Sequence, residues 1–311
     1  MTSPSTLAPP AARGRRELLR ALGAVIISPP PLCHPAAAGL GLPAPTPADH
    51  TGVFVLSAPP HAAIYLGAEG QLGGEALDRV AGFWRVLGLA PPPDSDNLGT
   101  LLLLYAELGD AEAAAHREAA RWQLRRAKEA LLWEHLWSWA PGYLTAVSRL
   151  DMPSLGQWAR LTARALGREA RQAAAPAVLP LALRAAPASL GTVSAASNGA
   201  LDRADGDGLL DALLAPVRSG VVLTRENLQE AAAAAGVGCR LGERRYTLAA
   251  MLGQDAAATL GWLSDFALQW ADWHAGRLPT AGPDPRHWWA HRARHTAATL
   301  KELQRQLVTA G

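Results

Sequence analysis

The sequence predicts an all-α protein, on three observations. Hydrophobic residues make up 49% of the 311-residue chain and charged residues 18%, which is typical of a folded globular protein rather than a disordered one. Much of the apolar share is alanine, the strongest helix former, and only 6% of residues are aromatic. Between breaks rich in proline and glycine, apolar residues recur every three to four positions, as they do along one face of a helix.

The N-terminal residues combine a tail with an amphipathic helix. Residues 1–12 are rich in Ser, Pro and Ala, and we expect them to be disordered. The pair Arg15-Arg16 resembles a twin-arginine export signal, but Pro29 ends the apolar stretch that follows after about seven residues. We therefore favour an amphipathic helix, whose apolar face consists of Leu18, Leu22, Val25 and Ile26.

Proline and glycine mark the ends of the next elements. Residues 28–60 are too rich in proline for regular helix, so we expect an irregular connection there. Within it, Val53–Leu56 is a candidate for a short extended piece. Helical spacing of apolar residues resumes at Leu77, and Gly88 ends that helix.

Two helices are expected in the middle of the chain. Asp94 or Asp96 caps the first, which runs over about residues 98–108 and is broken by a Gly-Asp pair. The second, over residues 111–139, is the longest expected helix, and Pro141 closes it. Its C-terminal end is apolar on two faces, so it is either buried on both sides or keeps one face for a ligand.

The C-terminal half is predicted as a linker followed by further helices. A helix over about residues 154–173 ends the first domain, which spans residues 13–175. Residues 176–208 are the expected linker, because they are rich in Ala, Pro, Gly and Ser. Residues 209–311 form a helical C-terminal region. It carries three predicted helix caps and one aromatic stripe: Thr224, Asp255 and Asp284 as caps, and Trp262, Phe266, Trp270 and Trp273 as the stripe.

Charge, cysteine content and motifs exclude several classes of function. A net charge of +2 lacks the concentrated basic excess of a nucleic-acid binder. Cys33 and Cys239 form no CxxC pattern, which favours a reducing cytosol over a disulfide framework. The sequence has no run of eighteen or more apolar residues, so no membrane-spanning helix is predicted. No GxSxG, P-loop, GxGxxG after a strand or HExxH is present, so we expect a soluble, cytoplasmic binding protein without catalysis or cofactor.

Three stretches of the chain resemble one family. They are Tyr65–Gly70 with Phe83–Leu89, Pro92–Asn97 leading into Leu101–Tyr105, and Glu134–Pro141. Together they resemble the TorD/DmsD/NarJ-type chaperones of molybdenum-enzyme maturation, over about residues 13–170. Ala215–Gly220 and Gly242–Arg245 look like the C-terminal part of a longer branch of that family. The resemblance implies a TorD-like helical chaperone domain with a C-terminal helical extension.

The resemblance also implies a peptide-binding loop. Relatives carry an acidic-Pro-Asp-His pattern where this chain has Asp94, Ser95, Asp96 and Asn97, and Asn97 cannot charge near neutral pH as His can. Carboxylates on this loop can pair with the arginines of a twin-arginine signal peptide, and a Trp-lined groove can take its apolar helix. The predicted peptide-binding residues are Asp94, Asp96, Asn97, Tyr65, Trp133, Glu134, His135, Trp137 and Trp139. The alternative, that the aspartates cap a helix and the tryptophans are core, has equal weight.

The function implied is that of a cytosolic chaperone. It binds the signal peptide or the apo form of a molybdopterin-dependent, DMSO-reductase-type catalytic subunit, supports cofactor insertion and controls export. We expect no nucleic-acid partner, no stable membrane association, and a monomer or homodimer. The sequence does not name the client, say whether the signal peptide or the mature fold is bound, or assign a role to the C-terminal region.

Two alternatives use the C-terminal region. Residues 223–250 resemble the start of a helix-turn-helix, with Arg240, Arg244 and Arg245 as candidate DNA-reading residues of a transcriptional regulator. The other alternative is a metal site, because three histidines stand four residues apart on the terminal helix, at His287, His291 and His295. Neighbouring arginines and the absence of a nearby carboxylate or Cys make a solvated helix face the favoured reading.

Overall fold

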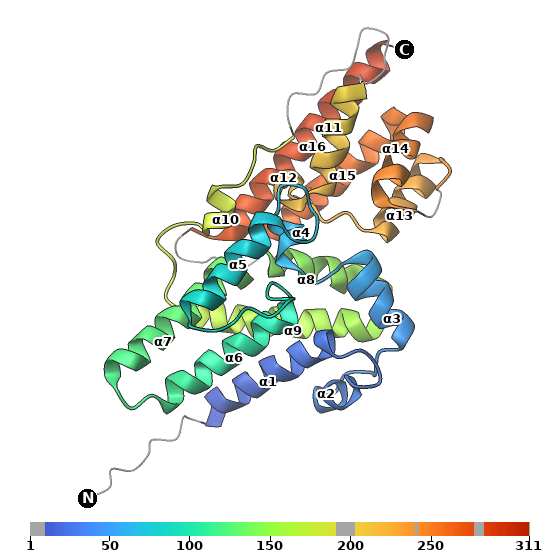
Figure 1. The fold of residues 1–311 in the computed structure, drawn as a ribbon. Coiled ribbons are helices and arrows are strands. Elements are labelled where there is room, and N and C mark those ends of the chain that lie inside the picture. Colours follow the sequence, from blue (N-terminus) through green and yellow to red (C-terminus); the bar gives the residue numbers. More distant parts are fainter. Residues whose placement is uncertain (1–9, 191–202, 240–241, 277–282, 311) are drawn as a thin grey trace, which may run out of the picture. The chain divides into compact units, whose positions relative to one another are not determined.

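The computed structural model describes residues 10–190, 203–239, 242–276 and 283–310 (Figure 1). Within these ranges the repetitive structure is helical, and extended pairing is limited to one antiparallel bridge between His61 and Asn97. The predicted all-α class is confirmed. None of the helices in these ranges combines the length and apolar character needed to cross a bilayer.

The chain divides into two compact units, and the first comprises residues 1–62 and 77–176. Its elements are α1 (Pro10–Ile27), α2 (His34–Gly39), α3 (Pro47–Thr51), η1 (Gly52–Ser57), most of α5 (Gly74–Val86), α6 (Leu98–Ala114), α7 (Glu118–Ala130), η2 (Leu131–Leu136), α8 (Ala140–Arg149) and α9 (Pro153–Gln172). Helix α1 packs against α6 and α9. A Cβ on Gly99 would lie 2.8 Å from the carbonyl oxygen of Gly23, so only glycine permits this approach of α1 to α6.

The second unit comprises residues 63–76 and 177–311. Its elements are most of α4 (Ala62–Leu66), α10 (Leu181–Arg184), α11 (Arg203–Leu214), α12 (Pro216–Ser219), α13 (Arg225–Ala235), α14 (Arg244–Gln254), α15 (Ala256–Ala275) and α16 (Pro285–Ala310). Helices α15 and α16 form its largest helix–helix contact, to which Ser264 contributes a 3.0 Å hydrogen bond to the carbonyl of Ala297.

The predicted caps and aromatic stripe of the second unit are confirmed. Thr224 forms a capping box with Asn227, and Asp255 accepts a 2.8 Å bond from the amide of Ala258. Asp284 accepts a 3.0 Å bond from the amide of Arg286. In the stripe, Trp262 stacks on Phe266, whose ring in turn contacts two further tryptophans edge-on, Trp270 and Trp273.

The proline-rich stretch 28–60 is more helical than predicted. Pro35 and Pro47 occupy first-turn positions of α2 and α3, where a proline costs no hydrogen bond. The extended piece expected at Val53–Leu56 is wrong, because these residues belong to the π-helix η1, with Val53 and Phe54 buried. A short apolar run does not distinguish a strand from a buried helix by periodicity.

The two helices expected between residues 98 and 139 are divided differently in the structure. Gly109 does not break α6, which continues to Ala114; Arg16 of α1 covers Gly109, where a Cβ would lie 2.7 Å from its Cδ. The expected helix 111–139 is instead the end of α6, then α7, η2 and a turn. Pro141 opens α8 rather than closing the helix before it.

The ends of the first domain differ in detail from the sequence predictions. Helix α1 starts at Pro10, so residues 10–12 of the expected tail are helical, and residues 1–9 lie outside the described residues. Helix α9 matches the helix predicted over 154–173. Within the expected linker 176–208 the structure places α10 and the start of α11, while residues 191–202 lie outside the described residues.

Candidate functional site

The loop between α5 and α6 carries the predicted acidic residues and is fixed to the segment before α4. The amide of Leu98 donates to the carbonyl of Pro60 at 2.8 Å, and the amide of Ala62 donates to the carbonyl of Asp96 at 3.1 Å. These backbone bonds, with the bridge between His61 and Asn97, hold the loop against residues 60–62. The loop is therefore a rigid feature of the first unit.

Asn97, and neither aspartate, is the N-cap of α6. Its backbone is extended, with φ −67° and ψ 134°, and its side chain accepts a 2.8 Å hydrogen bond from the amide of Gly99. The predicted capping by Asp94 or Asp96 is wrong, because both precede the position whose short side chain reaches the first-turn amides. At the position where the resemblance implies a chargeable His, this chain has a residue already engaged in capping.

Asp96 and Asp94 lie in opposite environments although one residue separates them. Asp96 is 3% exposed, and its Oδ1 lies 3.1 Å from Nδ1 of His61. Nε2 of the same imidazole lies 3.5 Å from Nδ2 of Asn97. Asp94 is exposed. Only Asp94 therefore presents its carboxylate at the surface of the loop.

His61 is a member of this cluster that sequence reasoning missed. It follows Pro59-Pro60, 35 positions before Asp96. No motif spacing links such distant residues, and the contact exists only because backbone bonds bring the two segments together. A polar residue directly after a proline pair, before a helical stretch, is the single local signal that marks it.

Helix α5 connects the loop to η2. The indole of Trp84 donates a 3.3 Å hydrogen bond to the carbonyl of Ser95 in the loop. Its neighbour Phe83 packs on His135 of η2, with ring centroids 4.7 Å apart. Burial, with a smaller contribution from Arg79, lowers the pKa of His135 to about 4, so this imidazole is neutral at physiological pH.

The three tryptophans predicted to line a groove are packed inside the first unit. Trp133 and Trp137 are each 8% exposed, and their rings meet edge-to-face at 6.2 Å. Trp133 donates to the carbonyl of Ala174 at 2.9 Å, and Trp139, 1% exposed, donates to the carbonyl of His135 at 2.7 Å. The two-faced apolar helix end is thus buried on both sides, and among these residues only Glu134 is half-buried rather than buried.

Tyr65 belongs to the second unit, whereas the other predicted peptide-binding residues belong to the first. It is 2% exposed, and burial raises its pKa. The structure therefore assigns Tyr65 to the core of the second unit.

Metal binding by the three histidines finds no support in the described residues. His287, His291 and His295 are exposed along α16, and no group of three His, Cys, Asp or Glu side chains within the described ranges is arranged to hold a metal ion. The favoured reading, a solvated helix face, agrees with this arrangement.

The helix-turn-helix geometry is also not favoured. Residues 236–243 separate α13 from α14, a longer connection than the three or four residues of that motif. Arg244 donates to the carbonyl of Leu223 at 2.8 Å, and Arg245 pairs with Asp207 and Asp211. Two of the candidate DNA-reading arginines are therefore engaged within the unit, and Arg240 lies outside the described residues.

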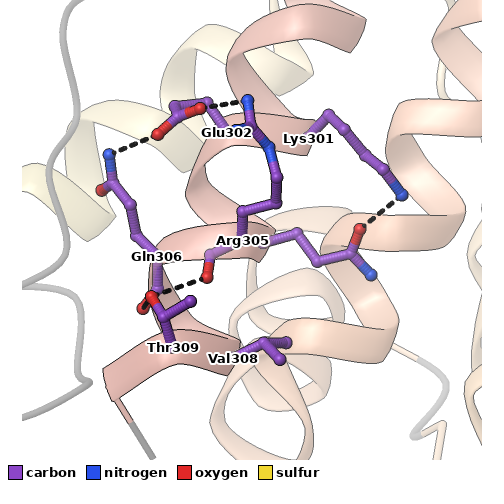
Figure 2. Close-up of a pocket in the computed structure, with 7 residues that line it drawn as sticks. Lys301, Glu302, Arg305, Gln306, Val308 and Thr309 are labelled. Carbon is purple, nitrogen blue, oxygen red and sulfur yellow. Dashed lines mark hydrogen bonds and ion pairs between the residues drawn. The ribbon is translucent and has the colours of Figure 1, made fainter.

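A depression near the end of α16 has a volume of about 400 Å³, and its polar groups pair among themselves (Figure 2). Lys301 donates to Gln304 at 2.9 Å, and Glu302 pairs with Arg305 and accepts from Gln306 at 3.0 Å. All of its lining residues come from one helix. It presents no converging set of unpaired groups and is not a candidate site.

Comparison with known proteins supports the family predicted from the sequence. Residues 42–144 match the family model described as nitrate reductase delta subunit. This is a NarJ/TorD-type family of molybdoenzyme maturation chaperones, not of enzymes, so the predicted resemblance is confirmed over these residues. No curated protein matches the chain significantly. The matched residues contain every predicted peptide-binding residue.

Proposed function

We propose that this protein is a cytoplasmic chaperone of molybdoenzyme maturation, on the premise that residues 42–144 match the nitrate reductase delta subunit family model. Its client is the catalytic subunit of a molybdopterin-dependent, DMSO-reductase-type oxidoreductase. Binding of the twin-arginine signal peptide or of the apo subunit supports cofactor insertion and delays export. The observation that carries the proposal is that the family match includes both the acidic loop 94–97 and η2.

We further propose that the predicted residues divide between contact with the client and positioning of the loop. Asp94 is exposed on a loop whose backbone is fixed, so its carboxylate can take a guanidinium at little entropic cost. Asp96 holds His61, and Asn97 caps α6; both position the loop. His135 and the tryptophans are buried and pack within the first unit. Glu134, half-buried on η2, is the second carboxylate proposed to contact the client.

The proposal is tested by capture of the client on the tagged full chain from an extract of the native host. We expect a molybdoenzyme catalytic subunit to be recovered, and Asp94→Ala to reduce its recovery without a change in protein stability. Asp78→Ala, on the exposed side of α5, is the matched control and leaves recovery unchanged. Recovery of no molybdoenzyme subunit would overturn the chaperone function, whereas equal recovery by Asp94→Ala would overturn only the contact role.

A second measurement distinguishes the signal peptide from the mature fold. A labelled twin-arginine signal peptide of the recovered subunit is titrated with the full chain, beside the same peptide with both arginines replaced by lysine. Bidentate pairing with a carboxylate favours arginine over lysine, so the lysine peptide binds more weakly if the loop reads the signal. Absence of peptide binding, together with capture of the subunit, would assign recognition to the mature fold.

A further inference from the structure

A small apolar pocket lies on the first unit, where α1 packs against α9. Its volume is about 220 Å³, and its walls are formed by Leu18, Leu19, Leu161 and Ala165. Small-molecule sites typically measure roughly 300–1,000 Å³. A recess below that range suits one apolar side chain of a protein partner, as in the anchor pockets of protein–protein interfaces.

Three arginines also line the pocket, and only one of them has an acidic partner. Nε of Arg15 lies 3.1 Å from Oε1 of Glu169, whose other oxygen accepts a 3.1 Å bond from the hydroxyl of Tyr105. Arg164 and Arg168 are exposed and form no ion pair or side-chain hydrogen bond with another described residue. The pocket therefore carries an excess of positive charge at its rim.

The arginines continue along α9 as one surface, which we call the basic face: Arg160, Arg164, Arg168 and Arg171. At 100° per residue these four positions fall within about 80° of arc on the helix. Glu169 is the single acidic residue of α9, and it is engaged by α1 and α6. An arginine in a last helical turn offsets the helix dipole, which accounts for Arg171 but not for Arg164 and Arg168, which precede that turn.

We propose that the basic face and its pocket form a docking surface for an acidic segment of a partner protein. Carboxylates of the segment pair with Arg164 and Arg168, and an apolar side chain between them enters the pocket. Arginine is suited to this role, because its planar guanidinium takes a carboxylate through two parallel hydrogen bonds. The surface is separate from the loop 94–97, so its test does not depend on the proposed contact role of that loop.

The pocket's chemistry favours a protein segment over other anions. Its lining contains no aromatic ring on which a nucleic-acid base stacks. A membrane-surface helix exposes a broad apolar face, whereas here the apolar area is recessed between two helices. The chain's own residues 1–9 contain no Asp or Glu, so they do not supply the complementary charge.

The test uses the full chain and a fluorescein-labelled helical peptide in which Leu is flanked by Glu at one-turn spacing. We expect the peptide to bind and its affinity to fall with rising salt, because the paired charges are exposed. The same peptide with Gln in place of Glu, or with Ser in place of Leu, binds more weakly. Arg164→Glu/Arg168→Glu weakens binding by about tenfold or more, since charge reversal turns two attractions into repulsions. Leu161→Asn, which removes one apolar wall, weakens it less.

The control variant carries the same charge change elsewhere on the first unit. Arg85 and Arg117 are exposed, and Arg85→Glu/Arg117→Glu leaves the affinity unchanged. Helix content measured by circular dichroism verifies folding, and Arg164→Gln/Arg168→Gln replaces the charge-reversed variant should that one unfold. If Arg164→Glu/Arg168→Glu binds the peptide as tightly as Arg85→Glu/Arg117→Glu does, the proposed docking surface is overturned. Tighter binding to duplex DNA or to phosphatidylglycerol vesicles than to the peptide would overturn the choice of a protein partner.

Discussion

The loop before α6 and the basic face of α9 belong to the same unit but use their charged groups in opposite ways. In the loop, the carboxylate of Asp96 is buried against His61, and the side-chain oxygen of Asn97 caps helix α6. On α9, Arg164 and Arg168 are exposed beside a pocket and have no acidic partner within the described residues. Polar groups that the fold has already paired contribute to stability, whereas unpaired exposed charges remain available to a partner.

The same contrast separates the two aspartates of the loop. In the sequence Asp94 and Asp96 look alike, since both are carboxylates of one motif. The structure buries one and exposes the other, so their substitutions should differ in kind. Four changes to the protein or its conditions test this distinction between paired and unpaired groups, from the largest expected effect to the smallest.

Trp158→Ala should remove the packing that holds α9 in place. Trp158 is fully buried, donates a 3.0 Å bond to the carbonyl of Leu22 in α1, and meets Phe54 edge-to-face. We expect a loss of about 3–5 kcal/mol in the free energy of unfolding, measured by urea denaturation. The control Trp122→Ala, at a 61% exposed position, changes it by less than about 0.5 kcal/mol. A small effect of Trp158→Ala would show that α1 and α9 are held by other contacts.

Acid should destabilise both units, because each contains a buried neutral histidine. Burial lowers the pKa of His135 and of His274 to about 4, from an ordinary value of 6.5. Between these two pH values the unfolded chain binds more protons than the folded one, so stability is complete above pH 6.5 and falls as the pH drops towards 4.

The acid effect is measured by calorimetry at pH 7 and at pH 4.5, and each histidine accounts for up to about 3 kcal/mol over the whole window. His135→Gln should remove the part of this acid-dependent loss of stability that comes from the first unit, where the His135 ring packs on Phe83 of α5. His116→Gln, at an exposed position, is the control variant. Equal pH dependence of His135→Gln and the unaltered chain would contradict the assignment.

Asp96→Ala should cost about 1–3 kcal/mol, because it leaves the half-buried imidazole of His61 without its acceptor. Asp94→Ala should change the free energy of unfolding by less than about 0.5 kcal/mol, as expected for an exposed side chain. Thermal denaturation of the two variants side by side measures the difference. Similar losses for both would mean that Asp94 also has a structural role, and the contact role proposed for it would need revision.

Arg164→Glu/Arg168→Glu should have the smallest effect on the fold. The two side chains are exposed and unpaired, so we expect the free energy of unfolding to change by less than about 0.5 kcal/mol. The measurement is the same urea denaturation as for Trp158→Ala. If the free energy of unfolding falls by about 2 kcal/mol or more, the basic face has a structural role, and the reason to propose a partner for it is removed.

Helix ends in the second unit were predictable because caps are local chemistry. Thr224, Asp255 and Asp284 each satisfy amides two or three residues further along the chain. The same local reasoning is wrong for Asp94 and Asp96, since several polar residues stood next to each other and only their backbone angles decided that Asn97 caps α6.

Long-range contacts were not predictable from the sequence. Pairing of His61 with Asp96 depends on backbone bonds between two segments of the first unit. The break between α6 and α7, at Ala115–Arg117, contains neither proline nor glycine. It is stabilised by the packing of α7 back on α6, where Glu112 accepts from both Lys128 and Arg125 at 2.6 and 2.8 Å.

The sequence by itself determined the all-α class and most of the helix caps, because composition, spacing and capping act over one or two helical turns. It also carried the resemblance that is confirmed over residues 42–144. Only the tertiary structure decided which charged side chains are paired within the fold and which are exposed to a partner. Burial and pairing are properties of contacts between distant segments, and they separate Asp96 from Asp94 and the basic face from the paired arginines of α1.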